Sequence, residues 1–263
     1  MPPYHLNALV LAQHKLGETD LIVTLLAADG SQVRAVAKGA RKPASGFAAR
    51  LEPFTVVDLL VHTGRGALDV ISEARILSSH RECRSDPERF ALCAVMAELL
   101  VQTTVPDEPD AVLFPMTCAA LDAADNAVPA NMPLITAGHL LKVLAVLGVR
   151  PALDECAFCG RPLEPLPASD GSAFTYAGGG RVCASCRDAA VGGIDAVDPV
   201  VLSWVQVLLG STFAQIAAME IGEVQGTESE LSSKLLRFCE AWLRAHLELH
   251  LKSLDVCFRS HIV

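Results

Sequence analysis

Apolar side chains between residues 1 and 80 occur in short runs that turn residues separate. The runs are rich in Val, Leu and Ile and occupy residues 4–14, 20–28, 33–37, 54–62 and 68–77. Runs of this composition and length, bounded by turns such as Asp29-Gly30, predict β-strands. Five short strands favour a small closed barrel, because closure leaves no exposed strand edge. We therefore predict an OB-type barrel over residues 1–80, an architecture whose faces and loops can bind single-stranded nucleic acid.

From Asp86 onward the apolar spacing changes to the period of helices. Asp86-Pro87 and Asp198-Pro199 each place a capping carboxylate before a proline, which is typical of a helix start. Thr227 and Glu230 have the spacing of a capping box. Helices are predicted between Asp86 and Pro106 and over residues 110–124, 133–148, 199–213 and 228–250. The fold class is thus α+β, with an all-α helical domain formed by residues 81–150 and 191–263.

Two Cys-x-x-Cys pairs interrupt the helical sequence. They are Cys156 with Cys159 and Cys183 with Cys186, and the stretch 160–182 separates them. Each pair can direct two thiolates at one point, and four thiolates satisfy tetrahedral zinc. The loop between them is rich in Pro and Gly and has little apolar content, so a metal would supply folding energy. Four thiolates leave no open position for water, so we predict one structural Zn²⁺ in a zinc-ribbon-like insertion at residues 151–190.

Composition narrows the class of protein. The chain of 263 residues is 51% hydrophobic and 5% aromatic, which indicates aliphatic cores. We find neither an uninterrupted apolar run of about 18 residues nor a basic segment followed by an apolar one at the start, so we expect no membrane span and no signal peptide. We therefore expect a cytoplasmic protein with reduced thiols. Most of the other cysteines, Cys83, Cys93, Cys118, Cys239 and Cys257, are expected to be buried small hydrophobic side chains.

Charge is unevenly distributed along the chain. The net charge is −9, yet residues 1–80 carry 8 Lys and Arg against 7 Asp and Glu. Residues 81–150 carry 5 against 9, and residues 151–263 carry 8 against 14. Only the segment 1–80 can therefore present a basic face to a polyanion.

A basic stretch without acidic residues lies between Asp29 and Glu52. Its positive charges can follow a phosphate backbone, and Phe47 could stack on a base or instead anchor its loop to the barrel. A solvated loop beside the barrel is the alternative interpretation of the whole stretch. The candidate DNA-binding residues are Arg34, Lys38, Arg41, Lys42, Phe47 and Arg50, with Arg65 from the turn between the fourth and fifth predicted strands.

Several motifs in this chain have the order and spacing found in the RecO family. In the predicted barrel they are Ala8-Leu9-Val10-Leu11, Gly17-Glu18-Thr19-Asp20, Leu21-Ile22-Val23-Thr24, Ala37-Lys38-Gly39-Ala40-Arg41-Lys42, Leu51-Glu52-Pro53-Phe54 and Gly64-Arg65-Gly66. Further along they are Leu147-Gly148-Val149-Arg150-Pro151-Ala152-Leu153-Asp154 before the first cysteine pair and Gly178-Gly179-Gly180-Arg181-Val182 before the second. The chain therefore resembles RecO proteins over most of residues 4–190.

The resemblance implies a bacterial recombination mediator of the RecF pathway, with an OB-fold, a helical domain and a zinc-ribbon-like element. It implies binding of single- and double-stranded DNA, strand annealing and, with RecR, loading of RecA onto DNA coated by single-strand binding protein. It also implies that the acidic tail of single-strand binding protein docks on the helical domain. Lys142, Arg237 and Arg244 are the charges available there. A nucleoid-associated, cytoplasmic location follows from the same resemblance.

Two other function classes stay open at this point. A zinc-dependent hydrolase or deaminase is one, because His80-Arg81-Glu82 and His246-Leu-Glu-Leu-His250 partly match metalloenzyme motifs. Neither stretch has the residue order that those motifs require, and we find no phosphate-binding loop and no nucleophile elbow. We therefore predict a protein that is not an enzyme. The other class is a protein-interaction scaffold that uses its acidic helices.

Overall fold

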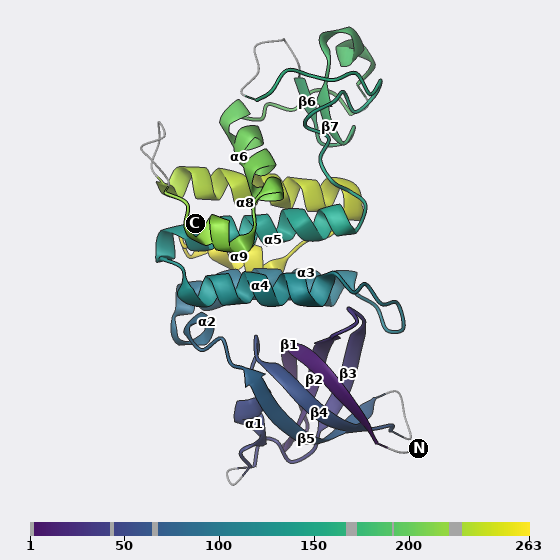
Figure 1. The fold of residues 1–263 in the computed structure, drawn as a ribbon, viewed down its shortest axis with the longest axis vertical. Helices are drawn as coiled ribbons and strands as arrows, with labels where there is room; N and C mark the ends of the chain where they lie inside the picture. Colours follow the sequence, from purple (N-terminus) through teal and green to yellow (C-terminus); the bar gives the residue numbers. More distant parts are fainter. Residues whose placement is uncertain (1–2, 43–44, 65–67, 167–172, 191, 221–227) are drawn as a thin grey trace. The chain divides into compact units, whose positions relative to one another are not determined.

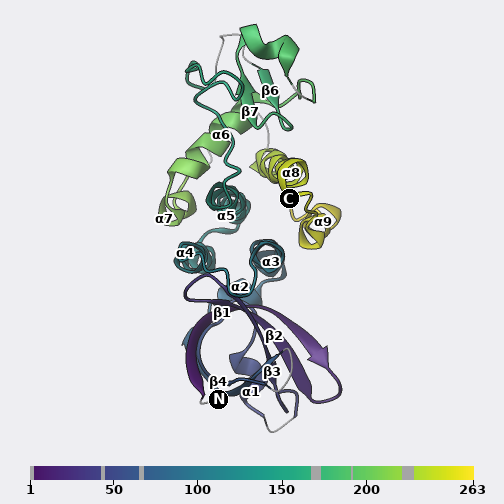
Figure 2. The same ribbon diagram turned by 90° about the vertical axis from the view of Figure 1, so that its right-hand side faces the viewer.

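The computed structural model describes residues 3–42, 45–64, 68–166, 173–190, 192–220 and 228–263. Its N-terminal part is a closed barrel of five strands, whose ring is visible in Figures 1 and 2. The strands are β1 (Tyr4–Leu16), β2 (Asp20–Ala27), β3 (Gln32–Ala37), β4 (Val56–His62) and β5 (Asp69–Ser78). They lie in the order β1-β2-β3-β5-β4, and β1 pairs with β4 to close the ring. The predicted OB-type barrel and its five strands are thus confirmed.

Strand pairing and bulges let these strands close around one core. The β3–β5 pair is parallel and the other strand pairs are antiparallel, with register shifts near Val10 in β1 and near Val57 and Val61 in β4. Such bulges increase strand bending, which a small barrel requires. The buried cluster inside is aliphatic: Ala8, Val10, Leu21, Val23, Leu25, Ala35, Ala37, Ala40, Leu51, Val57, Leu59, Val61, Ile71 and Ala74.

The helices follow the predicted start signals closely. The side chain of Asp86 accepts a hydrogen bond from the backbone N–H of Arg89 at 2.8 Å, and Pro87 is the first helical residue. Asp198 caps the next such helix in the same way, through the N–H of Val200 at 2.9 Å. In residues 1–126 the helices are α1 (Phe47–Arg50), α2 (Glu82–Ser85), α3 (Pro87–Thr103) and α4 (Leu113–Asn126).

The C-terminal half differs from the sequence prediction in two places. Its helices are η1 (Pro129–Asn131), α5 (Met132–Val146), η2 (Ala184–Ala189), α6 (Pro199–Gly210), α7 (Phe213–Ala217), α8 (Glu228–Leu247) and α9 (Lys252–Arg259), and its strands are β6 (Ala173–Thr175) and β7 (Gly180–Val182). The helix predicted over 199–213 ends at Gly210, because Thr212 and Gln215 form a capping box that starts α7. The helix predicted over 228–250 ends at Leu247, and Glu248 adopts a φ of 55° before α9 begins. Thr227 of the predicted capping box lies outside the described residues.

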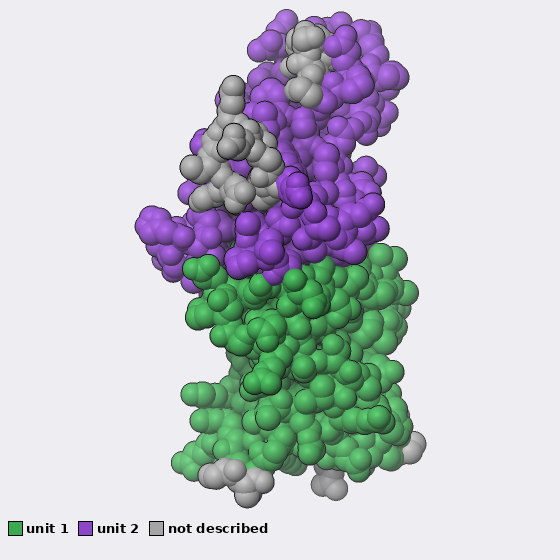
Figure 3. All heavy atoms as spheres, turned by 60° about the vertical axis from the view of Figure 1, so that its left-hand side comes forward, with its two compact units in different colours: residues 1–126 green, residues 127–263 purple. Residues whose placement is uncertain are grey.

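The chain divides into two compact units, residues 1–126 and 127–263, coloured separately in Figure 3. The first unit contains the barrel together with α2, α3 and α4. Part of the predicted helical domain therefore packs with the barrel, while the segment limits 1–80, 81–150 with 191–263, and 151–190 stay predictions. In the part of the chain that the structure describes, every helix is too short or too polar to cross a membrane.

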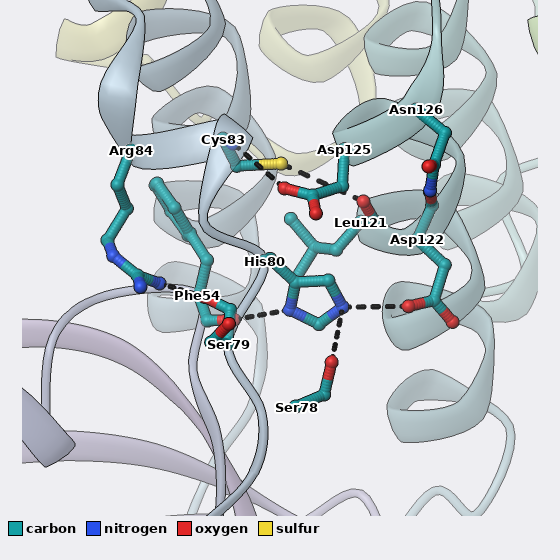
Figure 4. A network of polar contacts seen from close by, with 10 residues as sticks. All are labelled: Phe54, Ser78, Ser79, His80, Cys83, Arg84, Leu121, Asp122, Asp125 and Asn126. Carbon is teal, nitrogen blue, oxygen red and sulfur yellow. Dashed lines mark hydrogen bonds and ion pairs between the residues drawn. The ribbon is translucent and has the colours of Figure 1, made fainter.

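Buried polar contacts join the barrel to its helices within the first unit. His80 follows β5, has only 3% of its surface exposed and adopts a φ of 36°. Figure 4 shows its ring between the barrel and α4: Nδ1 lies 2.6 Å from the carbonyl oxygen of Phe54, and Nε2 lies 2.9 Å from Oδ1 of Asp122. Each ring nitrogen of His80 thus faces an acceptor oxygen, one from the barrel loop and one from α4. His80 thereby connects a loop of the barrel to α4.

A second buried polar side chain acts in the same way. The Gln32 amide donates to the carbonyl oxygens of Val101 and Thr104 at 3.0 and 3.1 Å, at the end of α3. Arg84 of α2 pairs with Glu52 at 3.0 Å, on the loop that precedes β4. These contacts explain why helices distant in sequence from the strands fold as one unit with them.

We predict that His80→Ala lowers the free energy of unfolding of this unit by about 1–3 kcal/mol, because it leaves the buried Phe54 carbonyl without its donor. Alanine keeps a β-carbon, so the backbone strain at this position changes little. Urea unfolding followed by circular dichroism measures the effect. His5→Ala is the matched control: its ring is 77% exposed and pairs with Asp58 at 3.4 Å, so its loss should cost about 0.5 kcal/mol or less. Equal effects of the two substitutions would contradict the role given to His80.

Candidate metal centre and nucleic-acid interface

The two cysteine pairs come together in a small ribbon in the second unit. Cys156 and Cys159 lie on a turn in which Gly160 N–H donates to the Cys156 carbonyl at 2.9 Å. Cys183 follows β7 directly, and the N–H of Cys186 donates to its carbonyl at 3.0 Å at the start of η2. Each pair thus has the tight turn that Cys-x-x-Cys spacing predicts.

The four thiols form one cluster. Their sulfur atoms all lie within 4.8 Å of one another, and those of Cys159 and Cys183 are 3.9 Å apart. Cys156 and Cys183 are buried, whereas Cys159 is exposed. Four thiols converging on one point fit a tetrahedral metal ion, and the ion's charge would remove the repulsion between neighbouring thiolates. The predicted ligand set is therefore brought together, and it can hold a metal.

Backbone donors favour the thiolate at Cys156. Burial by itself raises the pKa of this thiol, but N–H groups of Cys183, Cys159 and Phe158 outweigh burial and lower that pKa to about 6. The N–H of Cys183 lies 3.4 Å from its sulfur. At Cys186, hydrogen bonds with the side chains of Cys183 and Cys159 raise the pKa to about 12.

A buried arginine holds the ribbon together around the thiols. Arg181 is 1% exposed and its guanidinium donates to the carbonyl oxygens of Leu153 and Glu164, both at 2.8 Å. Gly180 precedes it with a φ of 153°, and a β-carbon there would lie 2.2 Å from the Ala152 carbonyl oxygen. The family-like Gly-Arg-Val stretch thus serves close backbone packing beside the second cysteine pair. Sequence reasoning assigned no role to Arg181, since an arginine gives no signal of burial.

An aromatic cluster fastens the ribbon to α8. Phe174 and Tyr176 of the ribbon contact Phe238 and Trp242 of α8, with ring centroids 5.4–6.1 Å apart. Trp242 also donates to the Val149 carbonyl at 2.8 Å. Such pairs are favourable beyond the area that they bury, so the ribbon has an apolar anchor as well as its metal ligands.

The basic stretch lies along one strand and loop of the barrel. Arg34 is exposed on β3, and Lys38, Arg41 and Lys42 are exposed on the loop that follows it. Arg50 is exposed at the end of α1. The structure brings Arg41 to the β1–β2 turn, where its guanidinium donates to the carbonyl oxygens of Gly17 and Glu18 at 3.3 and 3.0 Å.

Phe47 and Arg65 differ from the other predicted DNA-binding residues. Phe47 is half-buried and packs against the hydrophobic cluster of the barrel, which favours the anchoring interpretation over base stacking. Arg65 lies outside the described residues.

The three charges suggested for partner binding occupy different surroundings. Arg237 and Arg244 line one hollow of about 390 Å³ with Tyr176 and Glu240. Arg237 lies over the Phe258 ring at 4.4 Å, and Arg244 pairs with Glu240 at 2.8 Å. Lys142 instead donates to the Leu209 carbonyl at 2.9 Å, and burial lowers its pKa.

A second group of possible ligands, Glu240, His250 and Asp255, lies between α8 and α9. His250 and Asp255 contact each other at 2.8 Å. Arg244 lies 2.8 Å from the Glu240 carboxylate, and Arg259 lies 3.7 Å from that of Asp255. Two guanidinium groups already neutralise these acids, so the group is best described as an ion-pair network that joins the two helices.

The histidines of the partial metalloenzyme motifs also have structural surroundings. His80 is the buried contact to Asp122 described above. His246 packs against Trp242, with ring centroids 4.3 Å apart and the rings tilted by 36°. These contacts give both histidines packing roles rather than catalytic ones.

Comparison with known proteins agrees with this arrangement. The family model described as "Recombination protein O N terminal" matches residues 1–80, and "Recombination protein O C terminal" matches residues 84–255. The chain belongs to the RecO family. It is 41% identical to the "DNA repair protein RecO" of Frankia casuarinae over 191 residues, which cover 71% of this chain and 74% of that relative. The family identification made from the sequence motifs is confirmed, and RecO proteins are DNA repair mediators rather than enzymes.

We predict that the purified protein holds about one metal ion and that Cys156→Ala lowers this ratio towards zero, because three thiols bind far more weakly than four. Elemental analysis by mass spectrometry after gel filtration measures the ratio. Cys118→Ala is the matched control, since Cys118 is a half-buried thiol of α4 outside the cluster. Retention of the metal by the Cys156 variant would show that the cluster is not the site.

Proposed function

We propose that this protein is a recombination mediator of the RecF pathway type that binds single- and double-stranded DNA through its barrel. It promotes annealing and, with RecR, loads RecA onto DNA coated by single-strand binding protein. The observation that carries the proposal is the acid-free stretch after Asp29, whose described Arg and Lys side chains are exposed on one strand and loop of an OB-type barrel. Membership in the RecO family supports it.

The chemistry of the exposed groups suits a phosphate backbone. Arg34, Lys38, Lys42 and Arg50 project from the barrel as cations, and a strand laid across them would release its counterions. Positive charge of this kind gives affinity with little sequence preference, as a mediator of annealing requires. The net charge of −9 keeps the rest of the molecule from binding polyanions indiscriminately.

We propose zinc as the metal of the cysteine cluster and a structural role for it. Four sulfur ligands favour zinc and leave no position for a reacting water. The ribbon has little core of its own: its buried cluster consists of Cys156, Val182 and Cys183, with Leu163 and Cys186 packed against it. An ion bound there would stabilise the fold of residues 151–190 and take no part in a reaction.

We predict that changing Arg34, Lys38, Arg41 and Lys42 together to Ala weakens binding of oligo-dT at least tenfold. The slope of log K against log salt concentration should also become less negative by roughly 3, because each phosphate contact to a single strand contributes about −0.7 to that slope. Fluorescence anisotropy over a salt series measures both quantities.

The control for this variant is Arg75→Ala with Arg81→Ala, which removes two exposed charges of the same unit outside the basic stretch. It should leave the salt dependence nearly unchanged. Unaltered affinity and slope in the fourfold variant would overturn the proposed DNA face.

A partner surface is proposed for the second unit. The hollow lined by Arg237 and Arg244 combines two cations with the ring of Tyr176, which suits the acidic, apolar C-terminal tail of single-strand binding protein. We predict that a pulldown of single-strand binding protein by this protein needs the last residues of the tail. The double substitution Arg237→Ala with Arg244→Ala should weaken the binding that the pulldown measures. Lys234→Ala, on the same helix but paired with Asp198 and Glu230, is the control and should bind normally. Equal binding by all variants would place the tail elsewhere.

A further inference from the structure

One carboxylate lies against the basic loop of the proposed DNA face. Asp20 is the first residue of β2, and its Oδ1 accepts hydrogen bonds from the backbone N–H of Gly39 at 2.8 Å and from the hydroxyl of Thr19 at 2.9 Å. Gly39 lies between Lys38 and Ala40 in the basic loop. The acid of the β1–β2 turn is therefore bonded directly to the backbone of the loop that carries the cations.

Further bonds between the same two segments surround this contact. The N–H of Arg41 donates to the Thr19 carbonyl at 2.9 Å, and its guanidinium reaches the carbonyls of Gly17 and Glu18. The pairing of Leu21 with Ala37 in the barrel brings the start of β2 beside the end of β3. We call these contacts between residues 17–20 and 39–41 the turn–loop lock.

The hydrogen bonds to Oδ1 of Asp20 also stabilise its charged form. Its pKa lies below the usual value because the Gly39 N–H and the Thr19 hydroxyl stabilise the carboxylate, with smaller contributions from Lys38 and Lys42. Gly39 itself has a φ of 65°, a left-handed conformation that directs its N–H without steric cost.

We propose that Asp20 is a positioning residue for DNA binding: its carboxylate holds the Gly39 backbone so that Lys38 and Lys42 are ordered before DNA arrives. The inference rests on the proposed function of the basic stretch. Ordering a loop in advance removes part of the entropy loss on binding, so affinity rises without a new contact to DNA. Arg41 contributes to the same lock from the loop side.

The positioning role and the charge of Asp20 predict opposite effects of its removal on DNA affinity. A carboxylate near phosphates repels them, so its removal should tighten DNA binding if it had no other role. Glu18 provides the comparison, because it is an exposed carboxylate in the same turn whose backbone carbonyl, not its side chain, takes part in the lock. Asp20→Asn separates the two effects further, since the amide keeps an oxygen acceptor and loses the charge.

The test measures oligo-dT affinity by fluorescence anisotropy for Asp20→Ala, Asp20→Asn and Glu18→Ala in the full chain. We expect Asp20→Ala to bind roughly three- to tenfold more weakly, as the loss of one or two ordering hydrogen bonds implies. Asp20→Asn and Glu18→Ala should bind as well as the unchanged protein or more tightly. Amide hydrogen exchange at Gly39 should accelerate in Asp20→Ala and stay slow in the other two.

The outcomes are distinguishable. Unchanged or tighter binding by Asp20→Ala, or equal weakness of Asp20→Ala and Asp20→Asn, would overturn the positioning role. If the fourfold Ala variant of the basic stretch also binds normally, the proposed DNA face fails; if only that variant loses binding, the face stands and the inference about Asp20 fails. Should Asp20→Ala not fold, Thr19→Val removes the hydroxyl that orients the Asp20 carboxylate, with no change of charge, and should weaken binding about twofold.

Discussion

Closure of the barrel is the constraint on which the DNA face depends. The parallel pairing of β3 with β5 and the pairing of β1 with β4 complete a ring whose interior is filled by small aliphatic side chains. The ladder sets the register of β2 against β3, and that register brings the β1–β2 turn to the basic loop. The cations between Arg34 and Arg50 are thereby presented on a strand and loop of defined geometry.

Specific polar or metal-binding groups hold the junctions and the small ribbon of this molecule together. In the first unit, His80 and Gln32 join barrel and helices through buried hydrogen bonds that are costly to leave unmade. In the second, Arg181 satisfies two carbonyl oxygens inside the ribbon, and the thiol cluster can add a metal. The role that we propose for the cysteines is structural, and they lie far along the chain from the groups proposed to bind DNA.

The two units differ in the surroundings of their exposed charges. The barrel exposes cations, and the carboxylate of Asp20 beside them accepts a hydrogen bond from the loop backbone. On α8 and α9, Arg244 pairs with Glu240 and Arg259 with Asp255, while Arg237 lies over the Phe258 ring. A mostly acidic chain can in this way bind a polyanion at one surface while leaving another available to a protein partner.

The sequence by itself determined the strands, the helix starts at Asp86 and Asp198, the OB-type barrel and the four cysteines that cluster and could hold a metal, because periodicity, caps and Cys-x-x-Cys spacing are local signals. Which residues meet DNA stays a prediction, and the sequence gives no account of how those residues are held. Only the tertiary structure decided that Asp20 binds Gly39, 19 residues away, that His80 meets Asp122, 42 residues away, and that Arg181 is buried. It also decided that Phe47 packs on the barrel core. Such contacts join segments distant in sequence, and their partners are selected by strand register and helix packing, which local patterns of residues do not encode.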